Sequence, residues 1–142
     1  MIIPDVNVLV YAHIGTMAEH VPARAWWNDL LNRPVSLGLP WSVICGFVRV
    51  TTNRRAMNDP LTIDQAFMAV DSWLASPRVQ IIEPGPRHYS ILQTLLHGTA
   101  GGNLVTDAHL AAIAMEHNAE IASNDNDFAR FSGLKWHNPL KE

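Results

Sequence analysis

The chain has little cysteine, little lysine and no long apolar run, and each shortage excludes a class of protein. Its 142 residues include a single cysteine, Cys45, so no internal disulfide can form, and a lone thiol is typical of a reducing compartment. No apolar run approaches the roughly 18 residues that a membrane span needs. The first residues lack the basic and long apolar segments of a signal peptide. We therefore expect a cytoplasmic protein that does not enter a membrane.

Charge is also sparse, because Asp, Glu, Lys and Arg together make up only 16% of the residues. The formal net charge of −3 does not predict a nucleic-acid binder, which usually carries a basic stripe. If four of the aspartates share one site, removing their four negative charges changes −3 to +1 for the rest of the chain. Eight of the ten basic residues are arginines, which suit forked contacts to phosphate. The net charge therefore neither supports nor excludes an anionic substrate.

Short apolar runs alternate with longer segments of helical periodicity. The predicted strands are residues 1–4, 35–39, 79–82, 120–123 and 134–136. The predicted helices are residues 21–32, 42–51, 62–74, 86–97 and 107–117, with a short helical turn at 127–131. Strands separated by helices imply parallel pairing, with helices on both faces of the sheet. The sequence thus predicts one domain over residues 1–142, a three-layer α/β/α sandwich with a mainly parallel central sheet.

Local signals refine three of these helices. Thr62, followed three residues later by Gln65, has the form of a capping box. Ser42 and Thr106 are expected to cap the helices that follow them. The tandem tryptophans at 26 and 27 are not expected to face one core together, so one of them is predicted to lie on a partner surface.

Acidic residues gather where the predicted strands end. Asp5 ends the first strand, and Asp125 and Asp127 follow the fourth. Asp107 lies in the first turn of an apolar helix that returns to the same edge. In parallel α/β sheets, ligands bind beyond the carboxyl ends of the strands, where strand order reverses. The four carboxylates are therefore predicted to meet in one cleft.

Converging carboxylates repel one another, and their pKa values rise unless a cation neutralises them. A cluster of oxygen donors without cysteine or paired histidines favours a hard ion, Mg²⁺ or Mn²⁺. Such an ion polarises a phosphoryl oxygen and activates water for attack on phosphorus. Each aspartate alone also fits an ordinary structural role, as a helix cap, a helix-dipole partner or a turn former. Their common location at one edge favours the metal site.

Two segments resemble the PIN domain family. MIIPDVNVLVYA at residues 1–12 resembles the family's opening, in which an aspartate ends the first strand and Asn or Ser follows two residues later. GNLVTDAHLAAIAMEHNAEIASNDNDFARFSGLKW resembles its carboxyl-terminal half, in which an aspartate starts an Ala-rich helix and a T-x-D-x-D-F-like segment follows the next strand. The middle matches weakly, apart from SVICGFVRV at 42–50. The length resembles that of the VapC toxins of bacterial toxin–antitoxin pairs.

The resemblance implies an Mg²⁺-dependent endoribonuclease of structured RNA that forms a dimer and is inhibited by a small VapB-like antitoxin. By this resemblance Asp5, Asp107 and Asp125 are the catalytic, metal-binding acids. The remaining roles go to Asp127 as a supporting acid, Asn7 and Ser42 as supporting polar groups, and Arg49 as a substrate-binding residue.

One position departs from the family pattern. Many members have a glutamate before the F-x-R of the third helix, whereas this chain has Gly46 before Phe47. The missing carboxylate would weaken cation binding and make a second metal ion less favourable. Glycine inside a helix also costs about 1 kcal/mol relative to alanine. Two readings stay open: Gly46 leaves room at the site, or it allows close helix packing.

Two other functions compete with the nuclease. A degenerate PIN domain would bind RNA or a protein partner without cleaving, and Gly46 keeps that reading open. A receiver-like phosphoacceptor also places an aspartate at a strand end beside Mg²⁺. That reading needs an acid pair after the first strand, a phosphoacceptor after the third strand and a lysine near the last strand. Lys135 and Lys141 are the only lysines, and the segment after the third strand offers only Glu83, so the receiver is disfavoured.

Overall fold

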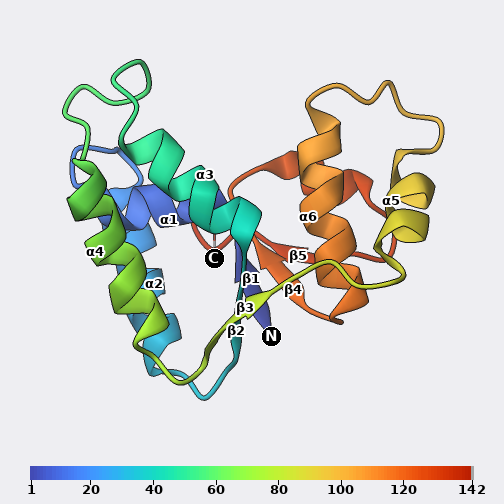
Figure 1. Cartoon of the computed structure of the whole chain (residues 1–142), viewed down its shortest axis with the longest axis horizontal. Coiled ribbons are helices and arrows are strands. Elements are labelled where there is room, and N and C mark those ends of the chain that lie inside the picture. The colour runs from blue at the N-terminus through green and yellow to red at the C-terminus, as the bar shows by residue number, and fades with distance from the viewer. Residues whose placement is uncertain (142) are drawn as a thin grey trace.

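The computed structural model describes residues 1–141, and it places a five-stranded sheet between two layers of helices (Figure 1). The strands are β1 Ile2–Pro4, β2 Leu37–Pro40, β3 Val79–Ile82, β4 Glu120–Ala122 and β5 Lys135–His137. Their order is β3-β2-β1-β4-β5, and all four pairings are parallel. The predicted three-layer sandwich with a parallel sheet is confirmed.

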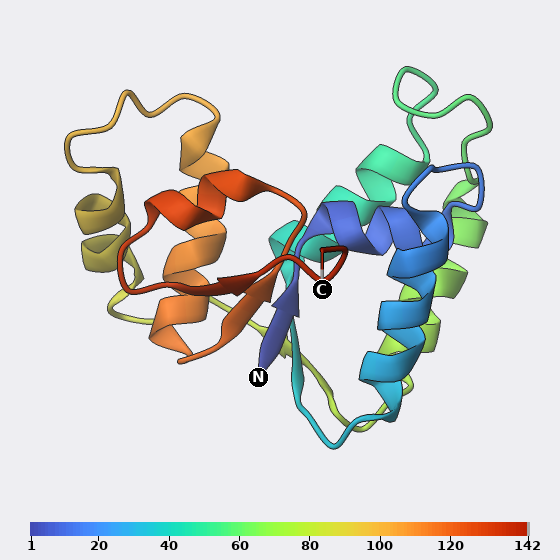
Figure 2. The same ribbon diagram turned by 180° about the vertical axis from the view of Figure 1, so that it is seen from behind.

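The helices divide unevenly between the two faces. They are α1 Val6–His13, α2 His20–Asn32, α3 Trp41–Thr51, α4 Ile63–Leu74, α5 His88–Leu96 and α6 Leu104–Glu116, with a 3-10 helix η1 at Asn126–Arg130. Helices α1 to α4 lie on one side of the sheet, and α5 and α6 on the other (Figures 1 and 2). None of the helices within residues 1–141 is long and apolar enough to cross a membrane.

The short strands are apolar because helices cover both of their faces. Ile3, Leu39 and Ile121 are fully buried in β1, β2 and β4. Helix α6 buries most of its length, whereas α5 has no buried residue. Since α5 packs mainly on α6 at the outside of the molecule, its apolar side chains are only half-buried: Ile91, Leu92, Leu95 and Leu96.

An aromatic cluster of His13, Trp27, Phe47 and Trp73 joins α1, α2, α3 and α4. The ring centroids of Phe47 and Trp73 lie 4.7 Å apart, and that of His13 lies 5.2 Å from Trp73, all in edge-on arrangements. His13 Nδ1 donates to the Leu9 carbonyl at 2.7 Å, and Trp73 Nε1 donates to His13 Nε2 at 3.0 Å. Burial lowers the pKa of His13, so the ring is neutral and fully hydrogen-bonded.

The prediction that one of the two tandem tryptophans lies on a partner surface is wrong. Trp26 is 8% exposed and Trp27 is 1% exposed, so both are buried. Their rings tilt against each other at 6.1 Å, and the broad face of α2 accommodates both. Exposed apolar side chains lie instead on α4 and at the start of α3, where Ile63, Phe67 and Trp41 are about half exposed.

Two of the three predicted caps are wrong. The Thr62 capping box is confirmed, with the Thr62 side chain accepting from the Gln65 N–H and the Gln65 side chain from the Thr62 N–H. Ser42 is not an N-cap, because α3 begins one residue earlier, directly after Pro40. Thr106 is not an N-cap either, because the glycine-rich turn at 101–102 lets α6 begin at Leu104.

Candidate metal centre

The site lies where the chain changes direction across the sheet. Successive strands run from β1 to β2 and β3 on one side, and the chain then crosses to β4 and β5 on the other. Loops that follow β1 and β4 therefore meet beside each other, at the edge where parallel α/β sheets bind ligands. The Asp5 N–H donates to the Ala122 carbonyl at 2.9 Å, which fixes this junction.

Asp5 is the first residue after β1 and the N-cap of α1. One carboxylate oxygen accepts from the Val6 N–H at 2.7 Å, and the other accepts from the Ser123 hydroxyl at 2.7 Å. Burial raises the pKa of Asp5, the two hydrogen bonds oppose that shift, and the nearby charge of Asp125 adds to it. The carboxylate is thus held rigidly in a position where its charge is unfavourable.

Ser123, which is fully buried, connects the two loops. Its hydroxyl donates to Asp5 and accepts from Asn7 Nδ2 at 3.2 Å and from the Asp125 N–H at 3.0 Å. Asn7 Oδ1 also accepts from the Asn124 N–H at 3.2 Å. A hydroxyl has one donor and two acceptor positions, so that of Ser123 is saturated. Sequence reasoning assigned no role to Ser123, although a small hydroxyl residue at a strand end, two positions before the Asp-x-Asp at 125–127, was a usable signal.

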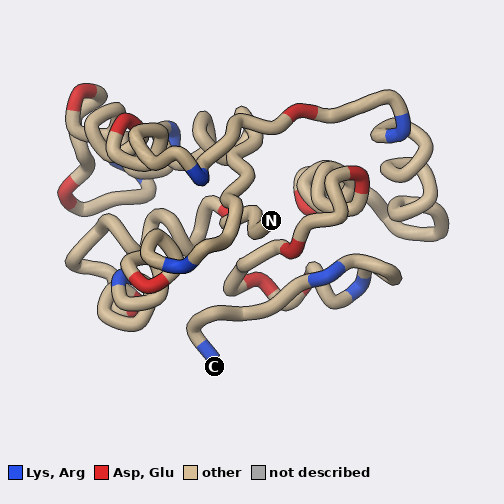
Figure 3. The backbone as a smooth tube through the Cα atoms, turned by 90° about the horizontal axis from the view of Figure 1, so that it is seen from below, with Lys and Arg blue, Asp and Glu red and all other residues tan. Residues whose placement is uncertain are grey.

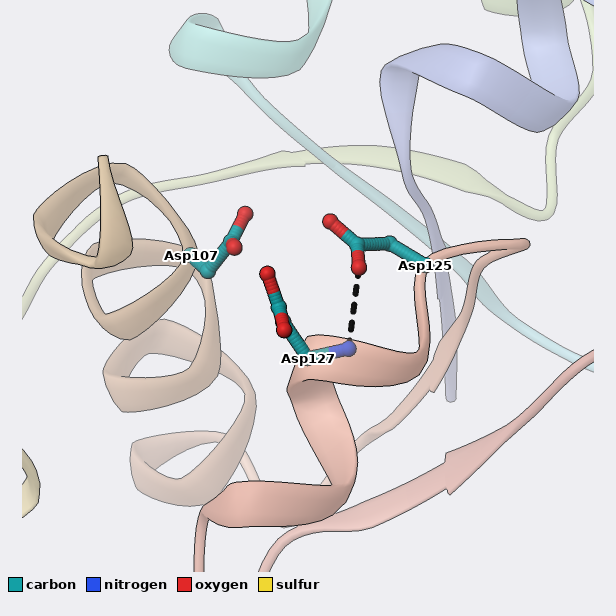
Figure 4. A group of neighbouring side chains, drawn as sticks. All are labelled: Asp107, Asp125 and Asp127. Carbon is teal, nitrogen blue, oxygen red and sulfur yellow. Dashed lines mark hydrogen bonds between the residues drawn. The ribbon is translucent and has the colours of Figure 1, made fainter.

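Asp107, Asp125 and Asp127 form an acidic cluster at this edge (Figure 4). Each offers one carboxylate oxygen, and these three oxygens lie within 4.8 Å of one another. Asp107 projects from the first turn of α6 toward the other two (Figure 4). Asp125 caps η1 by accepting from the Asp127 N–H at 2.9 Å, which fixes the relative position of these two residues. Asp127 also pairs with exposed Arg130 at 3.6 Å.

The electrostatics of the acidic cluster fit a cation. Partial burial raises the pKa of Asp107 to about 6, and the charges of Asp125, Asp5 and Asp127 add to this effect. The donors are all carboxylate oxygens, which suits Mg²⁺ or Mn²⁺ better than softer metals. Charges of both signs are otherwise scattered over both helical layers, without one wholly basic side (Figure 3). The residues present therefore fit a hard divalent ion.

The acidic cluster differs in one member from the three metal-binding acids inferred from the sequence. It contains Asp127, to which a supporting role was given, and it does not include Asp5. Asp5 lines a small hollow together with Asp107 and Ser42, so Ser42 does face the site. Asn7 supports the loop after β4 as described above. Arg49 lines a separate hollow between α3 and α4, on the surface with the exposed apolar residues.

Gly46 lies where α3 crosses α1. A Cβ atom added to Gly46 would meet Val6 Cγ2 at 2.6 Å, closer than van der Waals contact allows. Val6 follows Asp5 and lines the same small hollow. Of the two readings left open by the sequence, this contact supports close helix packing.

The family model of the PIN domain matches residues 2–134. The chain belongs to the PIN domain family. Among its relatives, "Ribonuclease VapC33" of Mycobacterium tuberculosis is 45% identical over 144 residues, which covers all of both chains. "Ribonuclease VapC43" of the same species is 46% identical over 141 residues, covering 99% of this chain and 96% of the relative. The resemblance seen in the sequence is thus confirmed along the whole length.

Solved structures share the fold of this PIN domain. A crystal structure of VapBC2 from Rickettsia felis, bound to a DNA fragment from its promoter, contains a chain that matches with a TM-score of 0.68 and 21% identity. The match covers 97% of this chain and 98% of that one. Mycobacterium tuberculosis VapC20, described as a toxin that cleaves the sarcin–ricin loop, matches with a TM-score of 0.68 and 16% identity over 95% of this chain.

Proposed function

We propose that this PIN domain is a metal-dependent endoribonuclease, the toxin of a VapBC-type toxin–antitoxin pair. The acidic cluster carries the proposal: three carboxylate oxygens lie within 4.8 Å of one another at the ligand-binding edge of the sheet. The full-length similarity to proteins named VapC ribonucleases supports the same conclusion. The alternative is a PIN domain that binds RNA or a protein partner without cleaving. It is based on Gly46, where many family members have a glutamate.

Asp107, Asp125 and Asp127 would hold Mg²⁺ or Mn²⁺, with Asp5 as a further acid near Asp107. A divalent ion bound there would polarise the scissile phosphate and make water a better nucleophile. The rigid loop that Ser123 organises would keep Asp125 in place during the reaction. Asp5, held by the Val6 N–H and the Ser123 hydroxyl, would add a fourth carboxylate beside the ion.

The proposal includes two kinds of partner. Structures that share the fold include VapBC complexes, so we assign this chain a VapB-like antitoxin as partner, in the cytoplasm. The exposed apolar side chains of Trp41, Ile63, Phe67 and Met68 offer surface for a protein partner, either the antitoxin or a second copy in a homodimer. Helix α2, also expected to offer such surface, exposes only Val21 among its large apolar side chains.

The test is incubation of the purified protein with total RNA, with and without Mg²⁺ or Mn²⁺, followed by mapping of the cut ends. Asp125→Asn is nearly isosteric and removes one charge from the acidic cluster, so we expect cleavage to fall at least about 100-fold. Asp71→Asn, on the exposed face of α4, is the matched control and should cut like the wild type. Specific binding of RNA without metal-dependent cleavage would favour the binding-only alternative.

A further inference from the structure

An apolar hollow of about 400 Å³ lies next to the acidic site, and the reaction scheme leaves it unused. Its walls come from α1, from the loop after α1 and from the loop between α3 and α4, which lie side by side at one end of the molecule (Figures 1 and 2). The side chains that define it are Val10, Tyr11, Met17, Val50, Ala56 and Met57. The volume falls in the range of about 300 to 1,000 Å³ that is usual for small-molecule sites.

The apolar hollow borders the site. Asp5 and Val6 line it, and the same two residues line the small hollow that contains Asp107 and Ser42. A group bound in the apolar hollow therefore contacts Asp5 and Val6, next to the hollow that contains Asp107. A nucleotide that neighbours the phosphate at the acidic cluster can reach this hollow.

The lining suits a flat, polarisable group. Tyr11 supplies an aromatic ring, and Met17 and Met57 supply sulfur atoms, which make favourable contacts with aromatic rings. Within residues 1–141, no hydrogen bond of the Tyr11 hydroxyl is found, so this group is available to the edge of a base. Single-stranded RNA is recognised mainly through unstacked bases held against such side chains.

Two arginines lie in the loop that supplies part of the wall of the apolar hollow. Arg54 and Arg55 directly precede Ala56 and Met57 in the loop between α3 and α4, and both are exposed. In the described part of the chain neither arginine pairs with an acidic side chain. Guanidinium groups bind phosphate oxygens in a forked geometry. The arginines would offset the repulsion between RNA phosphates and the acidic cluster.

From this arrangement we infer that the apolar hollow is a base-binding subsite, which takes one unstacked nucleobase beside the scissile phosphate and so determines where the RNA is cut. The inference rests on the proposed ribonuclease function and adds a determinant of substrate choice. The base enters between Tyr11 and the two methionines, and Arg54 and Arg55 hold the adjoining backbone.

The test fills the hollow from its exposed rim. Ala56→Trp places an indole where the base would lie, and Ala56→Leu fills less of the space. Ala75→Trp, at the exposed C-terminal end of α4, is the matched control. Melting curves verify that all three variants fold. Because base stacking on such a platform is worth about 5- to 150-fold in affinity, cleavage at the preferred site should fall by a factor in that range for Ala56→Trp and less for Ala56→Leu.

A second substrate separates loss of the base contact from general damage. An RNA with an abasic ribose next to the cut position should be cleaved more slowly than the intact RNA by the wild type and by Ala75→Trp. Ala56→Trp should cleave the two RNAs equally, because its subsite is already filled. Equal sensitivity of Ala56→Trp and the wild type to the abasic change would overturn the inference.

The remaining outcomes distinguish the two proposals. If the wild type cuts no RNA with either ion, both the proposed function and the subsite fail. If it cuts RNA and Ala56→Trp cuts the same positions at the same rate, only the subsite fails. If Ala56→Trp leaves cleavage unchanged but abolishes binding of the antitoxin, the hollow is a protein-docking site, and the inference is equally overturned.

Discussion

The aromatic cluster contains His13 at the end of α1, the acidic cluster lies near Asp5 at the start of α1, and the polar groups of the two clusters are partnered in opposite ways. In the aromatic cluster, His13 is neutral, and both of its ring nitrogens have partners. In the acidic cluster, three carboxylates face one another, and the pKa of Asp107 rises to about 6. The first arrangement is complete without any ligand, whereas the second becomes favourable only when a cation is added. We conclude that the first supports stability and the second supports function.

The largest effect is expected in the aromatic cluster. Phe47 is fully buried against His13 and Trp73. Phe47→Ala removes these contacts and leaves a cavity, so the free energy of unfolding should fall by about 3 to 5 kcal/mol. Urea unfolding followed by tryptophan fluorescence measures the loss. A loss below about 1 kcal/mol would mean that this cluster is not the stabilising region.

Ser123→Ala tests whether the hydrogen bonds beside the acidic cluster contribute to stability and cleavage as its charges do. The change leaves one carboxylate oxygen of Asp5, the Asn7 Nδ2 group and the Asp125 N–H without the Ser123 hydroxyl as partner, so we expect the free energy of unfolding to fall by about 1 to 3 kcal/mol and cleavage to slow. Ser72→Ala is the control, since its exposed hydroxyl donates only to a carbonyl of its own helix. Equal unfolding free energies for the two variants would contradict the role given to Ser123.

Gly46→Ala tests the contact that brings α3 close to α1. The added methyl group meets Val6, so the free energy of unfolding should fall by about 1 to 3 kcal/mol. Adding Val6→Ala should recover part of that loss, which a double-mutant cycle quantifies. Gly15→Ala is the control, because nothing lies within 4 Å of its added Cβ. A stabilised Gly46→Ala variant would instead support the reading that this glycine leaves room at the site. Gly46→Glu should likewise lower the melting temperature without tightening Mn²⁺ binding.

The smallest effect is a difference in pH dependence between the two regions. Because the folded state raises the pKa of Asp107, the contribution of this residue to the free energy of unfolding is fully present below pH 3.8 and is lost as the pH rises through about 6. Because the folded state lowers the pKa of His13, the contribution of this residue to the free energy of unfolding is present above pH 6.5 and is lost as the pH falls through the folded-state pKa. With divalent ions removed, Asp107→Asn should therefore stabilise the protein at pH 7.5, by about 1 kcal/mol once solvent screening of these partly exposed charges is allowed for.

Acid titrations of the variants measure this difference. On lowering the pH from 7.5 to 4, the advantage of Asp107→Asn over the wild type should disappear. His13→Gln should be less stable than the wild type at pH 7.5, and the gap should narrow toward pH 4. Parallel stability curves for the wild type and both variants would show that neither residue titrates as described.

The sequence predicted the layers, the strand positions and the edge where the acids gather, because these follow from short-range patterns. Apolar runs reveal buried strands, and Asp5 and Asp125 are identified by their places at strand ends. The sequence did not predict which carboxylates approach one another, because the reach of Asp127 depends on the η1 turn. It missed the burial of both Trp26 and Trp27, which depends on how broadly α2 packs. The contact between Gly46 and Val6 joins residues forty positions apart, and no local pattern encodes it.

Calorimetric titration of metal-free protein with Mn²⁺ at pH 7.5 tests most directly whether the acidic cluster holds a cation. We predict saturable binding by the wild type, at least tenfold weaker binding by Asp107→Asn, and unchanged binding by Asp71→Asn. Absence of saturable binding by the wild type, or equal binding by Asp107→Asn, would contradict the account.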